Sequence, residues 1–236
     1  MKISTNSLLD PRPVVGALAL IAATMAPAAG APAVGDSFTY QLVNGYNKEI
    51  LGKVRYQVTQ ADSNSITVSV IPNRADAGTA RTEIYTKGGN WLQVQIESHG
   101  KPLEYRFAAA FPAYVFPLNP GKTWSLRVNA KVPFMEQRRS VRVDGKVLGT
   151  ERIRVPAGEF DTIKIRRLVY PGDAQFTYSD THITEFDWYA PALGRSVRTE
   201  RNHKWMNTSE CGNVMGCEFR GSWVVLELVD SGGMKK

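Results

Sequence analysis

Hydrophobic and polar residues alternate along most of the chain after residue 33. Leu126, Val128 and Ala130 alternate with the polar residues Ser125, Arg127 and Asn129. Ile163 and Ile165 flank Lys164 in the same way. A period of two places one set of side chains on a buried face and the other in water. No stretch of eleven or more residues in this part has a helical apolar period. The pattern therefore predicts β-strands throughout.

Turn-forming residues separate the alternating runs at short intervals. These signals are Asn44-Gly45, Asp62-Ser63-Asn64, Gly88-Gly89-Asn90, His99-Gly100, Asp144-Gly145, Pro156-Ala157-Gly158 and Pro171-Gly172-Asp173. The runs between them predict strands over 36–44, 49–60, 65–71, 80–87, 91–97, 102–108, 123–132, 139–148, 150–155, 160–169, 181–189, 195–205 and 221–229.

Such short connections allow only antiparallel neighbours, because a parallel pair needs a crossover of about a dozen residues. We predict an all-β, single-domain fold, a curved antiparallel sheet that forms a partial barrel or a sandwich. Two segments lack this alternation of hydrophobic and polar residues. Residues 108–121 hold three prolines and three aromatic residues, and residues 206–220 form a loop that contains both cysteines.

The first 33 residues have the layout of a secretory signal peptide. Lys2 and Arg12 precede an uncharged apolar run over 14–25, and small residues follow up to Ala33. The run is shorter than the roughly 20 residues that a spanning helix needs, which argues against a retained membrane anchor. We predict a signal peptide over 1–33, cleaved near Ala33, and an exported antiparallel β domain over 34–236. The expected location is the periplasm, with no transmembrane anchor after cleavage.

The chain is basic, with a formal net charge of +7. Between Lys122 and Tyr170, twelve basic residues face only five acidic ones, and most of the basic residues occupy outward positions of consecutive strands. They could form a cationic sheet face that binds anions, or they could simply keep that face soluble. The predicted anion-binding residues are Arg127, Arg139, Arg142, Arg152, Arg154, Lys164 and Arg166. An exported chain rarely meets nucleic acid, so we expect no such partner.

The two cysteines, Cys211 and Cys217, lie in the exported part, where an oxidising environment favours a disulfide between them. A metal site with His203 as a further ligand is the alternative. Structural zinc sites use four ligands at tighter, repeated spacing. We therefore predict a disulfide, with no metal and no cofactor.

Three segments occur in the order and spacing of a known family. They run from Phe116-Pro117-Leu118 to Gly121-Lys122-Thr123-Trp124, from Val155-Pro156-Ala157-Gly158-Glu159-Phe160 to Ile163 and Ile165, and from Trp188-Tyr189-Ala190-Pro191 through Gly194-Arg195 to Val197-Arg198. Over residues 115–200 the chain resembles exported bacterial β-proteins known as domain of unknown function 3108 and their relatives. The resemblance implies a curved antiparallel sheet or partial barrel. It supplies no catalytic or binding residue.

The best candidates for catalysis are Glu185 and Asp187, which point to the same face of a predicted strand. Two carboxylates at that spacing could serve glycoside hydrolysis. The alternative is that they are solvated, or that they pair with Arg195 and Arg198 on the next strand, an ordinary cross-strand arrangement. We favour the second interpretation, and we do not expect an enzyme.

The sequence leaves the function unassigned and three hypotheses open. The first is a non-catalytic binding or structural protein of a Gram-negative cell envelope that holds an apolar or lipid-like ligand, with residues 108–121 over its mouth. The second is an assembly or interaction module that binds anionic lipid, lipopolysaccharide or a partner protein through the cationic face. The third is a periplasmic glycan hydrolase. The oligomeric state is left open.

Overall fold

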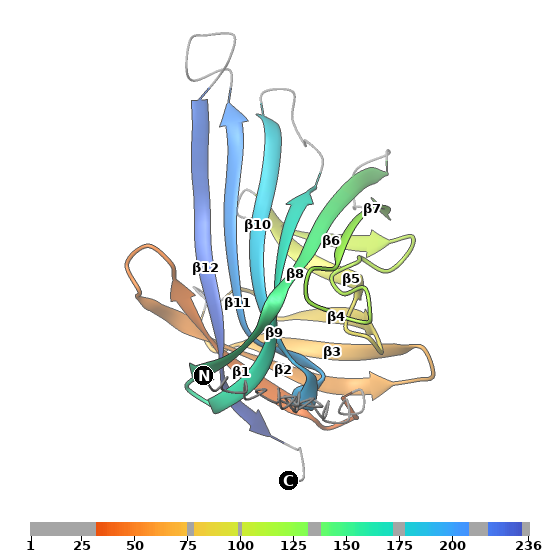
Figure 1. Ribbon diagram of the computed structural model, residues 1–236, viewed down its shortest axis with the longest axis vertical. Helices are drawn as coiled ribbons and strands as arrows, with labels where there is room; N and C mark the ends of the chain where they lie inside the picture. Colours follow the sequence, from red (N-terminus) through yellow and green to blue (C-terminus); the bar gives the residue numbers. More distant parts are fainter. Residues whose placement is uncertain are drawn as a thin grey trace, which may run out of the picture.

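The computed structural model of the protein describes residues 32–74, 78–98, 101–131, 138–171, 178–207 and 217–232. Within these ranges, twelve antiparallel strands form one closed barrel in which each strand pairs with its neighbours in sequence (Figure 1). The strands are β1 (Ser37–Asn44), β2 (Ile50–Ala61), β3 (Ser65–Pro72), β4 (Arg81–Thr86), β5 (Trp91–Ser98), β6 (Lys101–Phe107), β7 (Thr123–Lys131), β8 (Arg139–Val155), β9 (Gly158–Tyr170), β10 (Tyr178–Ala190), β11 (Arg195–Asn207) and β12 (Cys217–Gly232).

The prediction of an all-β antiparallel sheet is confirmed, and the choice between a partial barrel and a sandwich is corrected. The first strand, β1, pairs with the last, β12, from Ser37 opposite Gly232 to Asn44 opposite Val224. This pairing joins the two ends of the sheet and closes the barrel. Closure provides hydrogen-bond partners for the backbone N–H and C=O groups that the edge strands of an open sheet would expose. The alternation of side chains is the same in all three architectures, so it could not distinguish them.

The walls of the barrel differ in height. Strands β8 and β12 contain 17 and 16 residues, whereas β4 contains six. In Figure 1 the long strands β10, β11 and β12 run along the long axis of the molecule, and β2 and β3 cross below them at a steep angle. Strands β9, β10 and β11 supply Arg167, Glu185, Asp187 and Arg201 of the site described below.

Strand β8 shows why thirteen strands were predicted where twelve occur. It continues through Asp144 and Gly145, so the turn predicted there is wrong. Gly145 instead allows close packing, because a Cβ at that position would lie 2.0 Å from Cε2 of Trp124. The predicted strands 139–148 and 150–155 are one strand, interrupted only by a register shift between Val147 and Gly149.

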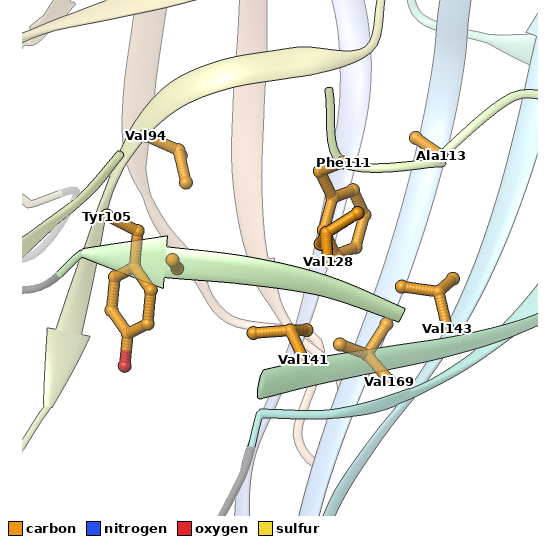
Figure 2. Packing of buried hydrophobic residues seen from close by; sticks show 9 residues of the cluster. Val94, Tyr105, Phe111, Ala113, Val128, Val141, Val143 and Val169 are labelled. Carbon is orange, nitrogen blue, oxygen red and sulfur yellow. The ribbon is translucent and has the colours of Figure 1, made fainter. Parts of the chain in front are cut away.

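Residues 108–122 contain neither strand nor helix, as predicted, and they fold against the barrel. The Phe111 amide donates to the Trp91 carbonyl at 2.8 Å, and the Trp124 indole donates to the Pro112 carbonyl at 3.0 Å. Figure 2 shows the Phe111 ring beside Val128 in the hydrophobic core. The buried residues of this cluster are Val94, Tyr105, Phe111, Ala113, Val128, Ala130, Val141, Val143 and Val169.

Two predictions fall partly or wholly outside the described residues. The predicted signal peptide lies there except for its last two residues, and so does Cys211. Cys217 begins β12 opposite Asn207 of β11, so the two strands extend further than predicted toward the cysteine loop. The disulfide between Cys211 and Cys217 and the signal cleavage stay predictions.

Candidate ligand-binding cavity

The barrel encloses a cavity of about 210 Å³. Its wall combines aliphatic and aromatic side chains with a set of charged groups. The apolar part includes Val58, Ile66, Val68, Trp91, Val94 and Leu226. The charged part includes Arg81, Glu83, Lys87, Arg167, Asp187, Arg195 and Arg201.

The loop over 108–122 contributes to this wall through Ala113 and Tyr114. Asn90 holds the loop in place, because its side-chain oxygen accepts from the Tyr114 amide at 2.7 Å and its side-chain nitrogen donates to the Tyr114 carbonyl at 2.9 Å. The Tyr114 hydroxyl reaches across the barrel, where it donates to Asp187 and lies 2.8 Å from the Ser196 hydroxyl. The loop is therefore part of the cavity.

The carboxylates Glu185 and Asp187 share one face, as predicted, but this face is the inside of the barrel, where both are almost fully buried rather than solvated. Glu185 lies directly opposite Arg167 on β9 and Arg201 on β11. Its oxygens are 3.0 Å from Arg167 Nε and 2.6 Å from an Arg201 nitrogen. Asp187 accepts from Arg167 at 3.2 Å and from the Thr199 hydroxyl at 2.8 Å. We call Arg167, Glu185, Asp187 and Arg201 the ionic cluster.

The prediction that these carboxylates pair with Arg195 and Arg198 is wrong. A bulge in β11 is the reason, because Tyr189 pairs with Ser196 whereas Trp188 pairs with Arg198. The extra residue, Val197, shifts the register by one and moves Arg198 to the other face of the sheet. There Arg198 forms ion pairs with Glu200 and Glu227.

The ionic cluster keeps Glu185 ionised. Burial alone would raise the pKa of Glu185, but Arg201 and Arg167 outweigh it and lower this pKa to about 2. Burial and the nearby Asp187 raise the pKa of Tyr114 well above its ordinary value. A glycosidase needs a carboxylic acid whose raised pKa keeps a proton available at neutral pH. Glu185 has the opposite property and does not fit the role of that acid.

Arg195 lies elsewhere in the cavity wall, among aromatic rings. Its guanidinium is 4.0 Å from the centre of the Phe38 ring, 5.3 Å from that of Tyr40 and 5.4 Å from that of Tyr56. Within the described residues, no carboxylate lies within ion-pair distance of Arg195. We call Arg195 with these three rings the Arg195 site.

A third charged group lies on the β4 side of the cavity. Glu83 is 2% exposed, pairs with Arg81 at 2.7 Å and accepts from the Tyr85 hydroxyl. The Arg81 guanidinium also reaches the Tyr56 hydroxyl at 3.5 Å. This group is thus internally compensated.

Four residues of the predicted cationic face form ion pairs with neighbouring acids. Ion pairs join Arg142 to Asp144, Arg152 to Asp161, Arg154 to Glu159 and Lys164 to Glu151. Arg127 and Arg166 are exposed. Arg139 is partly buried at the start of β8. Exposed pairs of this kind contribute little to stability, but they reduce the positive potential of the face. Its role in anion binding stays a prediction.

Some features of the site escaped the sequence interpretation. The sequence interpretation gives Arg167 no role in the site, yet this residue is 3% exposed inside the barrel. Its odd-numbered position matches Ile165 and Val169, which are also inward, and this spacing was the available signal. Tyr114 had no such signal, because it lies in a loop without periodicity.

Within the part of the chain that the structure describes, no group of three or more histidine, cysteine, aspartate and glutamate residues is placed to hold a metal ion. The same part contains no helix long and apolar enough to cross a membrane.

The structure thus defines a closed antiparallel β-barrel with an internal cavity that is partly charged. No protein-family model and no curated protein matches the sequence, so membership of the family of domain of unknown function 3108 stays a prediction.

Three solved structures are similar to this chain. A candidate lipoprotein from Parabacteroides distasonis has 15% sequence identity and a TM-score of 0.48, over 87% of this chain and 96% of the other. A candidate exported protein with a YmcC-like fold from Bacteroides fragilis has 17% identity and a TM-score of 0.43, over 87% and 100%. The hypothetical lipoprotein YmcC from Escherichia coli has 7% identity and a TM-score of 0.44, over 85% and 86%.

Proposed function

We propose that this protein is an exported, non-catalytic binding protein of a Gram-negative cell envelope, and that it holds an apolar or lipid-like ligand inside its barrel. The observation that carries the proposal is the cavity of about 210 Å³. An apolar cavity of about 150 Å³ is large enough to bind benzene, so this one accommodates a somewhat larger molecule. We also propose that this chain is related to the family of domain of unknown function 3108.

The composition of the wall supports an apolar ligand. Ile66, Val68 and Leu226 come from β3 and β12, on different parts of the barrel, and all three line the cavity together with the Trp91 ring. Ligand pockets typically combine such apolar surface with a few placed polar groups that orient the ligand. The loop over 108–122 contributes Ala113 and Tyr114 to this wall.

A non-catalytic role is supported by the state of the carboxylates. Glu185 and Asp187 both accept from Arg167, and Glu185 also accepts from Arg201. These interactions use the lone pairs that a nucleophile or general base would need. In this proposal the ionic cluster stabilises the barrel and shapes the polar end of the cavity.

Native mass spectrometry of protein purified from cells under gentle conditions tests the binding function. We expect the protein to retain a co-purified apolar molecule as an adduct. Leu226→Trp, which adds a ring at the cavity wall, should reduce the adduct, whereas Leu126→Trp at an exposed position of β7 should not. A bare protein mass under several gentle conditions would contradict the proposal.

Export is tested separately. Fractionation of cells that produce the full chain should recover the protein from the periplasm, with an N-terminus that begins near Val34. Recovery of the uncleaved chain from the cytoplasm would contradict export without bearing on the cavity.

A further inference from the structure

The charges that line the cavity do not balance. Each of the arginines 81, 167 and 201 has a carboxylate partner at 3.2 Å or closer. Glu83, Asp187 and the deeper Glu185 are occupied by these three arginines. Lys87 is exposed at the edge of the cavity. The cation left without a carboxylate partner in the wall of the described barrel is Arg195.

The surroundings of Arg195 provide only part of the compensation that a guanidinium needs. Three rings face it, and its polar contact with the Tyr40 hydroxyl is to a neutral group, whose proton goes to the Ser196 carbonyl at 2.6 Å. The Arg195 Nε atom is buried and has no hydrogen-bond partner. Arg195 as a whole is partly buried, and charges withdrawn from water in proteins are normally paired, because burial removes the water that would otherwise solvate them.

Two other orphaned polar atoms belong to the same cavity. Trp91 Nε1 and Gln95 Oε1 are buried without a hydrogen-bond partner, and both residues line the wall. A purely apolar ligand would leave Arg195 and these two atoms uncompensated. A ligand with one charged end and one apolar end matches the whole wall.

We propose that the cavity binds an anionic amphiphile, whose carboxylate or phosphate group pairs with Arg195 and whose apolar part lies along Ile66, Val68 and Leu226. The inference rests on the proposed binding function and adds the chemical class of the ligand. Guanidinium groups suit this role because their planar array of donors matches a carboxylate or a phosphate with two parallel hydrogen bonds. The apolar wall favours an amphiphile over a free inorganic anion, which would leave that surface uncovered.

Matched ligands that differ only in the head group test the inference. After co-purified material is removed with a hydrophobic resin, the binding of decanoate, decyl phosphate and decanol is measured by titration calorimetry. We expect at least one of the two anions to bind about tenfold more tightly than decanol, since a charge-assisted hydrogen bond is lost with the alcohol. The tighter of the two anions identifies the head group.

Two substitutions connect the preference to Arg195. Arg195→Gln should abolish the preference for the anion over decanol, because the charge that distinguishes the two head groups is gone. Arg195→Lys retains the charge and should retain part of the preference. Arg127→Gln is the matched control, because it removes the same charge from an exposed position of β7.

The outcomes separate the inference from the function on which it rests. Equal binding of anions and alcohol to the unmodified protein overturns the inference and leaves the binding function in place, and this comparison does not depend on any variant folding. A preference that persists in Arg195→Gln also overturns it. If neither anion nor alcohol binds, the binding function fails for this class of ligand, and the inference fails with it.

Discussion

Arg167 and Glu185 face each other across β9 and β10 as a buried ion pair, with Arg167 Nε 3.0 Å from Glu185 Oε2. Their side chains are 4% and 3% exposed. Arg167 also reaches the Ala113 carbonyl at 3.2 Å and therefore connects the strands to the loop over 108–122. This one side chain joins three parts of the barrel.

Removal of Arg167 should strongly destabilise the protein. Arg167→Met leaves Asp187 and part of Glu185 buried without their cation, and breaking a buried pair from one side typically costs about 3–5 kcal/mol. The free energy of unfolding from guanidinium denaturation measures the loss. Arg166→Met, at the adjacent exposed position, should change that free energy by only about 0.5 kcal/mol. Similar values for the two variants would contradict the importance of the cluster.

Stability should fall as the pH is lowered from about 6.5 to about 4. Burial and the adjacent Arg201 lower the pKa of His203 to about 4, so the unfolded chain binds a proton in this range that the folded chain does not. The full effect amounts to about 3 kcal/mol. Glu185, with its pKa of about 2, extends the loss to lower pH, below its ordinary value near 4.5.

Denaturation curves recorded across the pH range measure this dependence. The variant His203→Gln cannot take up the proton, so its stability should stay nearly constant between pH 6.5 and 4.5 and decline only below that range. If the stability of His203→Gln changes with pH as that of the unmodified protein does, the loss of stability between pH 6.5 and 4.5 comes from another group.

The Tyr114 hydroxyl should anchor the loop over 108–122. Tyr114→Phe removes the hydrogen bonds to Asp187 and Ser196 and retains the ring, so we expect a loss of about 1–3 kcal/mol in the free energy of unfolding. Faster proteolysis within the loop should accompany this loss. Tyr46→Phe, at an exposed turn, removes one hydroxyl with one partner and should have a smaller effect. Unchanged proteolysis in Tyr114→Phe would show that the backbone contacts suffice.

Gly145 should not tolerate a side chain. Gly145→Ala places a methyl group 2.0 Å from Trp124, on an inward position of a closed sheet, and overpacking of this kind typically costs about 1–3 kcal/mol. Thermal unfolding measures the change. Gly88→Ala is the control, since the nearest atom to its Cβ is 3.6 Å away. An unchanged melting temperature in Gly145→Ala would mean that the Trp124 ring moves aside.

Much of the strand pattern could be predicted because local alternation and turn residues encode it. The alternation around Val128, Ala130 and Ile165 correctly predicted the buried face, although Leu126 is 44% exposed. The turn at Pro156-Ala157-Gly158 was also predictable, because proline and glycine favour its backbone angles. Asp144-Gly145 has an equally strong local signal, yet the contact with Trp124 determines its role. Local signals cannot distinguish a glycine for a turn from a glycine for packing.

The candidate site was less predictable because it depends on register and on distant contacts. The pairing of Glu185 with Arg201 requires the extra residue Val197, and no feature of the sequence marks this bulge. The Arg195 site unites β11 with β1 and β2, which only the closure of the barrel brings together.

The pairing of β1 with β12 also has a consequence for the order of assembly. Ser37 and Gly232 are partners although almost the whole domain lies between them, so the loop that they close is the longest in the fold. A nascent chain can build its hairpins one after another, but β1 has no second neighbour until the C-terminal strand emerges. Chains that stop short of β12 retain two exposed strand edges, which are templates for aggregation. Completion of the last strand is therefore the step that converts an aggregation-prone intermediate into a closed barrel without exposed strand edges.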